Sequence, residues 1–189
     1  MRKLTCSLVI LLLVVMATSA LAEKKLTEAQ WWMWLEGEAS LNQAETLGVR
    51  ASTLFIVPTN AYLYAGPWWA PAEWLWIAPQ VGVTSTIGTN DDAGVAALWV
   101  ALTPTKWLSI FGDVEGWAAK DRTDVYSYSS VDGLFSLFNV GVQTESFNED
   151  LALGIHGGVT KKPWGVEGQI YYDPKNEIWF PRVVGRLKF

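Results

Sequence analysis

The last twelve residues alternate between apolar and polar side chains, and this pattern constrains the fold more than any other feature of the chain. One set of alternate positions carries three cations and the other set is apolar, so that Arg182, Arg186 and Lys188 alternate with Val183, Gly185, Leu187 and Phe189. Because successive side chains of a β-strand point to opposite faces of a sheet, the segment predicts a strand with one apolar and one cationic face. Such a strand suits a position between lipid and a polar interior.

The first 22 residues have the features of a secretory signal peptide. Arg2 and Lys3 precede an apolar run over 8–16, and a small-x-small site ends at Ala22. The run is shorter than the ~20 residues that a membrane-spanning helix needs, so we expect cleavage rather than anchoring. The predicted domains are therefore a cleaved signal peptide, residues 1–22, and one transmembrane β-barrel, residues 23–189.

Composition excludes several classes of function. Cys6 is the only cysteine and lies in the predicted signal peptide, so the mature chain would have no disulfide, no cysteine nucleophile and no thiolate metal site. Without residues 1–22 the chain carries 12 Lys and Arg against 19 Asp and Glu, which argues against nucleic-acid binding. The twelve tryptophans favour a bilayer interface, although a Trp-rich soluble core or a sugar-binding surface would give the same composition.

The mature chain consists of short strand-like segments separated by turn residues, without helical periodicity, which predicts an all-β meander. The candidate strands are 30–39, 45–57, 60–66, 73–86, 94–103, 107–117, 121–130, 134–147, 150–160, 164–173 and 178–189. Bacterial single-chain barrels have even strand numbers and both termini in the periplasm. The weakest candidate is 60–66, which is flanked by prolines that cannot donate to a sheet. Omitting it predicts a single closed antiparallel transmembrane β-barrel of about ten strands, with a range of 8–12.

A periplasmic C-terminus would orient the hairpins. The predicted outer loops are 173–177, 147–150, 118–121 and 88–92, and the predicted periplasmic turns are 161–163, 129–133 and 103–106. The outer loops are nearly as short as the turns, so we do not expect a large surface-binding apparatus.

The signal peptide, the alternating strands and the terminal Phe189 together resemble small bacterial outer-membrane β-barrels of the OmpA-type or small-porin-like kind, without indicating a subfamily. This resemblance covers nearly the whole chain. It implies location in the bacterial outer membrane and contact with outer-membrane lipids. It also implies recognition of the last strand by the barrel-assembly machinery, for which the assembly-signal residues would be Val183, Gly185, Leu187 and Phe189. The oligomeric state stays open.

Polar side chains avoid the apolar face of each predicted strand, and we expect them to line the lumen. The predicted lumen residues are Glu36, Glu38, Arg50, Asp113, Glu115, Gln143, Glu145, His156, Glu167, Gln169, Arg182 and Arg186. They would form either a charged constriction that selects small solutes or ions, or a network of ion pairs that holds the barrel shut. Four tryptophans share this parity and should point inward unless a bulge intervenes, namely Trp32, Trp34, Trp107 and Trp117.

The favoured function is an outer-membrane barrel that is structural or a narrow pore for small solutes or ions, with no catalysis, cofactor or metal. One alternative is a lipid-modifying barrel enzyme with His156 as its base, but the segment 154–158 contains no serine. A single histidine also cannot build an ordinary imidazole metal site. Another alternative is a soluble periplasmic lipocalin-like binder with an apolar cavity. The charged fraction of 17% is low for a solvated outer surface, which disfavours that version.

Overall fold

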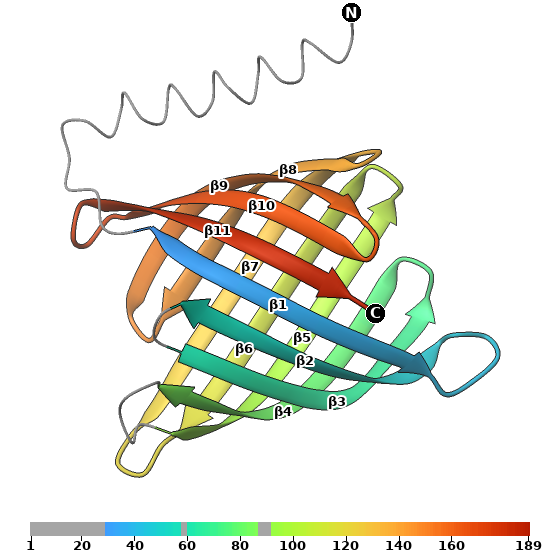
Figure 1. Ribbon diagram of the computed structural model, residues 1–189, viewed down its shortest axis with the longest axis horizontal. Coiled ribbons are helices and arrows are strands. Elements are labelled where there is room, and N and C mark those ends of the chain that lie inside the picture. Colours follow the sequence, from blue (N-terminus) through green and yellow to red (C-terminus); the bar gives the residue numbers. More distant parts are fainter. Residues whose placement is uncertain (1–28, 58–59, 87–91) are drawn as a thin grey trace, which may run out of the picture.

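The computed structural model describes residues 29–57, 60–86 and 92–189, which form one closed β-barrel of eleven strands (Figure 1). The strands are β1 (Gln30–Ser40), β2 (Leu47–Val57), β3 (Asn60–Ala72), β4 (Leu75–Thr86), β5 (Ala93–Thr105), β6 (Leu108–Ala118), β7 (Thr123–Phe135), β8 (Phe138–Phe147), β9 (Asp150–Lys161), β10 (Trp164–Asp173) and β11 (Ile178–Lys188). The predicted signal peptide and most of the predicted loop 88–92 lie outside the described residues. Among those residues, no helix has the length and apolar character required to span a bilayer.

The prediction of a closed all-β barrel is confirmed, and eleven strands fall within the predicted range of 8–12. Consecutive strands pair antiparallel, but β1 and β11 close the barrel as a parallel pair, with Gln30 opposite Arg182 and Glu36 opposite Lys188. Figure 1 shows β1 and β11 running side by side in the same direction. The parallel seam follows from the odd number of strands. It places the start of β1 and the end of β11 at opposite ends of the barrel.

The prediction that 60–66 is not a strand was wrong, because these residues belong to β3. The register of β3 with β4 places Pro67 opposite Pro79, so the two residues that lack an N–H face each other. The Gln80 side chain donates hydrogen bonds to the carbonyls of both prolines, at 3.2 and 2.9 Å. A register shift between Trp69 and Ala72 accommodates the remaining proline of β3, Pro71.

The predicted turn at 129–133 was also wrong, because these residues lie within β7 and the hairpin turns at Ser136, which has a φ of 59°. The segment resembles a turn because it contains serine, aspartate and glycine. In the barrel, Ser130 and Asp132 instead face inward and are joined by a hydrogen bond of 2.8 Å. Their polarity serves the interior of the barrel rather than a loop.

The outer surface of the barrel is apolar. Exposed side chains over the strands include Met33, Leu63, Val81, Val114, Val142, Ile155 and Val166. Ile155 is 54% exposed and Val166 is 51% exposed, while His156 and Glu167, their neighbours in the same strands, line the cavity. This is the arrangement of a transmembrane barrel, and it contradicts the soluble lipocalin-like alternative, which requires the reverse.

Aromatic side chains mark both ends of the apolar surface. Trp74, Trp107 and Trp164 are exposed at the end that holds the C-terminus, as expected for an interfacial girdle. Trp107 therefore does not point inward, because it precedes β6 in the turn rather than lying within the strand. At the opposite end, the rings of Tyr172 and Trp179 pack with centroids 4.9 Å apart.

The odd strand number predicts which chain segments share a side of the membrane. In single-cysteine variants, Ala29→Cys at the start of β1 should react with a membrane-impermeant maleimide from the same side as Glu177→Cys. Glu45→Cys, in the loop between β1 and β2, should react only from the other side. Labelling of intact cells against spheroplasts measures this. Reaction of Ala29→Cys and Glu177→Cys from opposite sides would contradict the eleven-strand topology.

Candidate functional site

The barrel encloses a cavity of about 1000 Å³. Its walls include Lys188 and Thr160 near the end of the barrel that holds the C-terminus, and Arg122 and Asp124 at the opposite end. The lining of this cavity thus includes residues from both ends of the barrel.

All of the predicted lumen residues point into the barrel. Those that line the cavity are Glu36, Glu38, Arg50, Asp113, Glu115, Glu145, His156, Glu167, Gln169, Arg182 and Arg186. Gln143 is buried behind them, where its side-chain oxygen accepts a hydrogen bond of 2.9 Å from the Tyr128 hydroxyl.

One ion-pair network connects the three strands around the parallel seam. Arg50 of β2 lies 3.0 Å from Glu36 and 2.9 Å from Glu38, both of which belong to β1. Lys188 of β11 lies 2.9 Å from the second oxygen of Glu38. These contacts tie β2, β1 and β11 together at the end that holds the C-terminus.

Arg182 forms a second cluster, deeper in the barrel, and is only 3% exposed. Its guanidinium donates two hydrogen bonds to Glu145 of β8, at 2.7 and 3.2 Å, and one of 3.0 Å to Gln30 of β1. The guanidinium carbon lies 3.6 Å from the centroid of the Trp32 ring. A buried charge of this kind requires such partners, and they join β11 to both β1 and β8.

His156 belongs to a hydrogen-bonded group centred on a carboxylate. Asp132 interacts with the His156 Nε2 atom and accepts hydrogen bonds from Ser130, at 2.8 Å, and Asn139, at 3.3 Å. Activation of a nucleophilic serine requires a histidine that lies between the serine and the aspartate, whereas here the serine donates directly to the aspartate. A side chain at Gly141 would place its Cβ 2.8 Å from the His156 ring, so this glycine makes room for the imidazole.

Aromatic side chains fill one side of the interior, and we call this group the aromatic wedge. It consists of Trp34, Tyr62, Tyr64, Trp99 and Trp117. The ring centroids of Tyr64 and Trp99 are 5.2 Å apart, and those of Trp34 and Trp99 are 5.9 Å apart. The wedge narrows the cavity on the side formed by β3 to β6.

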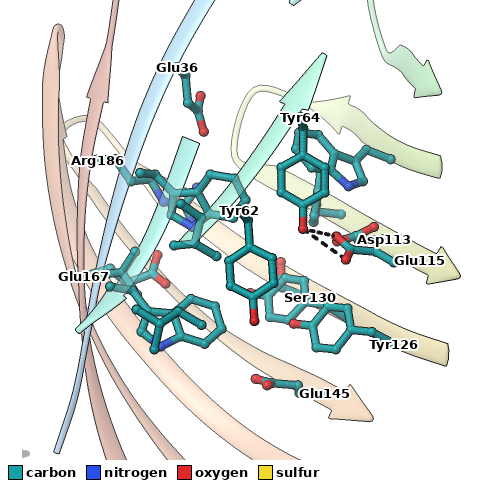
Figure 2. Close-up of a pocket in the computed structure, with 18 of the residues that line it drawn as sticks. Glu36, Tyr62, Tyr64, Asp113, Glu115, Tyr126, Ser130, Glu145, Glu167 and Arg186 are labelled. Atoms are coloured by element: carbon teal, nitrogen blue, oxygen red, sulfur yellow. Dashed lines mark hydrogen bonds between the residues drawn. The ribbon is translucent and has the colours of Figure 1, made fainter. Parts of the chain in front are cut away.

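Two buried carboxylates, Asp113 and Glu115, lie at the base of the wedge (Figure 2). The Tyr64 hydroxyl lies 3.0 Å from both carboxylate oxygens of Glu115, and the Trp117 indole donates to the same group at 2.7 Å. Glu115 thereby fixes the orientation of two wedge rings. Within the part of the chain that the structure describes, neither carboxylate forms an ion pair.

The other side of the interior is open and charged. Arg186 is exposed to the cavity, and among the described residues no carboxylate lies within ion-pair distance of it. In Figure 2, Arg186 lies with Glu36 and Glu167 on one side of the view, and Tyr64, Asp113 and Glu115 lie on the other. The cavity therefore has a packed aromatic wall and a charged wall.

Sequence reasoning missed several residues of the interior, among them Tyr64, Trp99, Asp124 and Asp132. Tyr64 lies on the omitted segment 60–66, and Asp132 lies in the segment assigned to a turn. The alternation that identified Asp113 as a lumen residue would also have placed Tyr64 and Asp132 inside the barrel if their strands had been assigned correctly. Trp99 stands in a nearly uniform apolar strand, where parity carries little information.

The predicted assembly-signal residues lie at the outer face of the C-terminal strand and its end. In the parallel seam, Val183 stands opposite Trp31, Gly185 opposite Met33, and Leu187 opposite Leu35. Phe189 is exposed, and its backbone N–H donates a hydrogen bond of 2.9 Å to the carbonyl of Glu36.

Comparison with known proteins finds similarity in the fold. No family model and no curated protein sequence matches the chain. Among solved structures, the KdgM porin is similar with a TM-score of 0.55 and 12% sequence identity, over 72% of this chain and 80% of that one. A triple mutant of the porin from Rhodopseudomonas blastica gives a TM-score of 0.47 and 14% identity, over 78% of this chain and 52% of that one. The similarity to the KdgM porin shows that the chain has the fold of a porin-like β-barrel, a coarser assignment than the OmpA type considered from the sequence.

Proposed function

We propose that the protein is a bacterial outer-membrane barrel that acts as a narrow water-filled pore for small solutes or ions, without catalysis. The observation that carries this proposal is the cavity, whose walls include residues at both ends of the barrel. The exposed guanidinium of Arg186 supports it, because a charge that makes no ion-pair contact among the described residues is stable at this depth only when water reaches it.

The charge of the cavity wall favours cations over anions. Apart from Asp113 and Glu115, which are buried in the aromatic wedge, the wall contains six carboxylates, Glu36, Glu38, Asp124, Asp132, Glu145 and Glu167, against five basic residues, Arg50, Arg122, Arg182, Arg186 and Lys188. Fixed charges that line a narrow pore concentrate counter-ions and repel ions of the same sign. The proposed pore is therefore cation-preferring.

Catalysis is left out of the proposal because the histidine group has the wrong connectivity for an activated serine. Ser130 donates to Asp132 and not to His156. A lipid-modifying barrel enzyme would require the serine hydroxyl to donate its hydrogen bond to the histidine. A changed lipid profile in cells that carry His156→Ala would argue for the enzyme instead.

Two further expectations from the sequence belong to this proposal. Cleavage of the signal peptide after Ala22 and recognition of β11 by the barrel-assembly machinery both stay predictions. The second is supported by the outward, accessible position of Phe189 at the end of the strand.

Planar-bilayer recording of the refolded chain tests the pore. We expect discrete openings whose reversal potential in a salt gradient indicates a preference for cations. Asp124→Asn, which removes a carboxylate from the cavity wall, should reduce that preference. Asp121→Asn, on the exposed loop at the same end of the barrel, serves as the matched control and should change it less. A correctly folded protein that stays electrically silent would refute the pore.

A further inference from the structure

Arg186 differs from the other cations of the C-terminal strand. Arg182 and Lys188 each lie within 3.0 Å of a carboxylate, at 2.7 Å from Glu145 and 2.9 Å from Glu38. Arg186 points into the same interior, but in the described part of the chain it forms neither an ion pair nor a hydrogen bond. Its guanidinium is therefore available to a molecule in the cavity.

Glu167 of β10 is a carboxylate that faces the same region of the cavity. Its two oxygens accept hydrogen bonds from the amides of Gln169, at 2.6 Å, and Asn139, at 3.1 Å. No ion pair of Glu167 occurs among residues 29–57, 60–86 and 92–189. The two amides hold the carboxylate in place without neutralising it.

The sheet register places these two groups of opposite charge close together. Arg186 stands opposite Gly165, and Glu167 stands opposite Val184, so the two charged residues are diagonal neighbours on adjacent strands. Diagonal neighbours in an antiparallel pair are about 7–8 Å apart, within reach of long side chains. Because Gly165 has no side chain, nothing from that position covers the guanidinium.

A solute that satisfies both groups must itself carry both charges. A guanidinium binds a carboxylate through two parallel hydrogen bonds, and a carboxylate binds an ammonium group. A simple anion would meet the repulsion of Glu167, and a simple cation would meet that of Arg186. We propose that Arg186 and Glu167 form a two-point binding site for small zwitterions of the amino-acid type.

The neighbouring wall provides an apolar contact for the rest of such a solute. Trp34 stands directly opposite Arg186 across the parallel seam and lines the cavity. A short aliphatic group held between the two charges would lie against this ring. The cavity of about 1000 Å³ is large enough for a molecule of this size.

This inference rests on the proposed pore only for the access of the solute, so it is tested by equilibrium binding rather than by conductance. The full chain, refolded in detergent micelles, is titrated with alanine, propionate and ethylammonium, with saturation-transfer NMR as the readout. Propionate lacks the ammonium group of alanine, and ethylammonium lacks its carboxylate. We expect alanine to bind at least about tenfold more tightly than either, which corresponds to a difference of about 1.4 kcal/mol.

The variants assign the two contacts separately. Arg186→Met should reduce alanine binding to the level of ethylammonium, and Glu167→Gln should reduce it to the level of propionate. Arg186→Lys keeps the charge and should retain part of the affinity. Lys120→Gln, on an exposed loop, is the control and should bind alanine as the wild type does. The comparison of the three ligands on the wild-type protein tests the proposal even if a variant does not fold.

The outcomes separate this inference from the proposed function. Propionate binding as tightly as alanine, or insensitivity to Glu167→Gln, would overturn the zwitterion site in favour of a simple anion site. Absence of binding by a protein that conducts would overturn the site and leave the pore. Saturable alanine binding by a protein that never opens would support the site and refute the pore.

Discussion

Arg182→Met should lower the free energy of unfolding by about 3–5 kcal/mol, the typical cost of removing one partner of a buried ion pair. The substitution leaves Glu145 without the guanidinium that donates to both of its oxygens. It also removes the contact with Gln30 and the packing over Trp32, which are links across the parallel seam. The effect is measured as the urea midpoint of the folded band in lipid vesicles.

The matched control for this experiment is Arg186→Met, which makes the same change four residues further along β11, on the same face of the strand. Because Arg186 has no carboxylate within ion-pair distance among the described residues, its removal should shift the midpoint little. The double variant Arg182→Met with Glu145→Gln should recover part of the lost stability, because the carboxylate that had lost its partner is replaced by a neutral amide. Equal destabilisation by the two arginine variants would show that the Glu145 pair is not what stabilises this strand.

Trp99→Ala should both destabilise the barrel and enlarge the current through it. Trp99 is 3% exposed and lies in contact with Trp34 and Tyr64, so its truncation leaves a cavity inside the aromatic wedge. Truncating a buried aromatic side chain costs about 3–5 kcal/mol. The freed space adjoins the charged side of the cavity, which should raise the single-channel conductance of the proposed pore.

Trp107→Ala provides the control with the same change of residue. Trp107 is 57% exposed at the rim of the barrel and lines no part of the cavity. Its truncation should leave the conductance unchanged and reduce stability much less. A folded Trp99→Ala variant with wild-type conductance would show that the wedge does not limit the water-filled path.

Alternation of side chains was sufficient to predict the class of fold and the direction of most polar residues. Asp113 and Glu115, for example, follow each other at a spacing of two on β6, and the structure places both on the inner wall. Period-two reasoning works here because a barrel wall is one layer thick and each side chain has only two directions available.

The same reasoning failed where one residue type has two uses. Pro67 of β3 suggested a break, but it faces Pro79 across the strand pair, which no local window can reveal. Ser130 and Asp132 suggested a turn, because hydroxyl and carboxylate groups occur both in turns and in polar interiors. The contact between Arg182 and Glu145 joins β11 to β8, and it depends on the curvature of the closed barrel rather than on the register of adjacent strands.

The parallel closure limits how this chain can be rearranged. In a barrel with an even number of strands, a few residues can join the two ends of the polypeptide, and new ends can then be opened in any loop. Here a connector would have to travel the whole height of the wall, since eleven residues of strand extend about 36 Å. Circular permutants with short connectors should therefore fail to close, and a gene for this barrel cannot have arisen solely by repeating a two-strand unit.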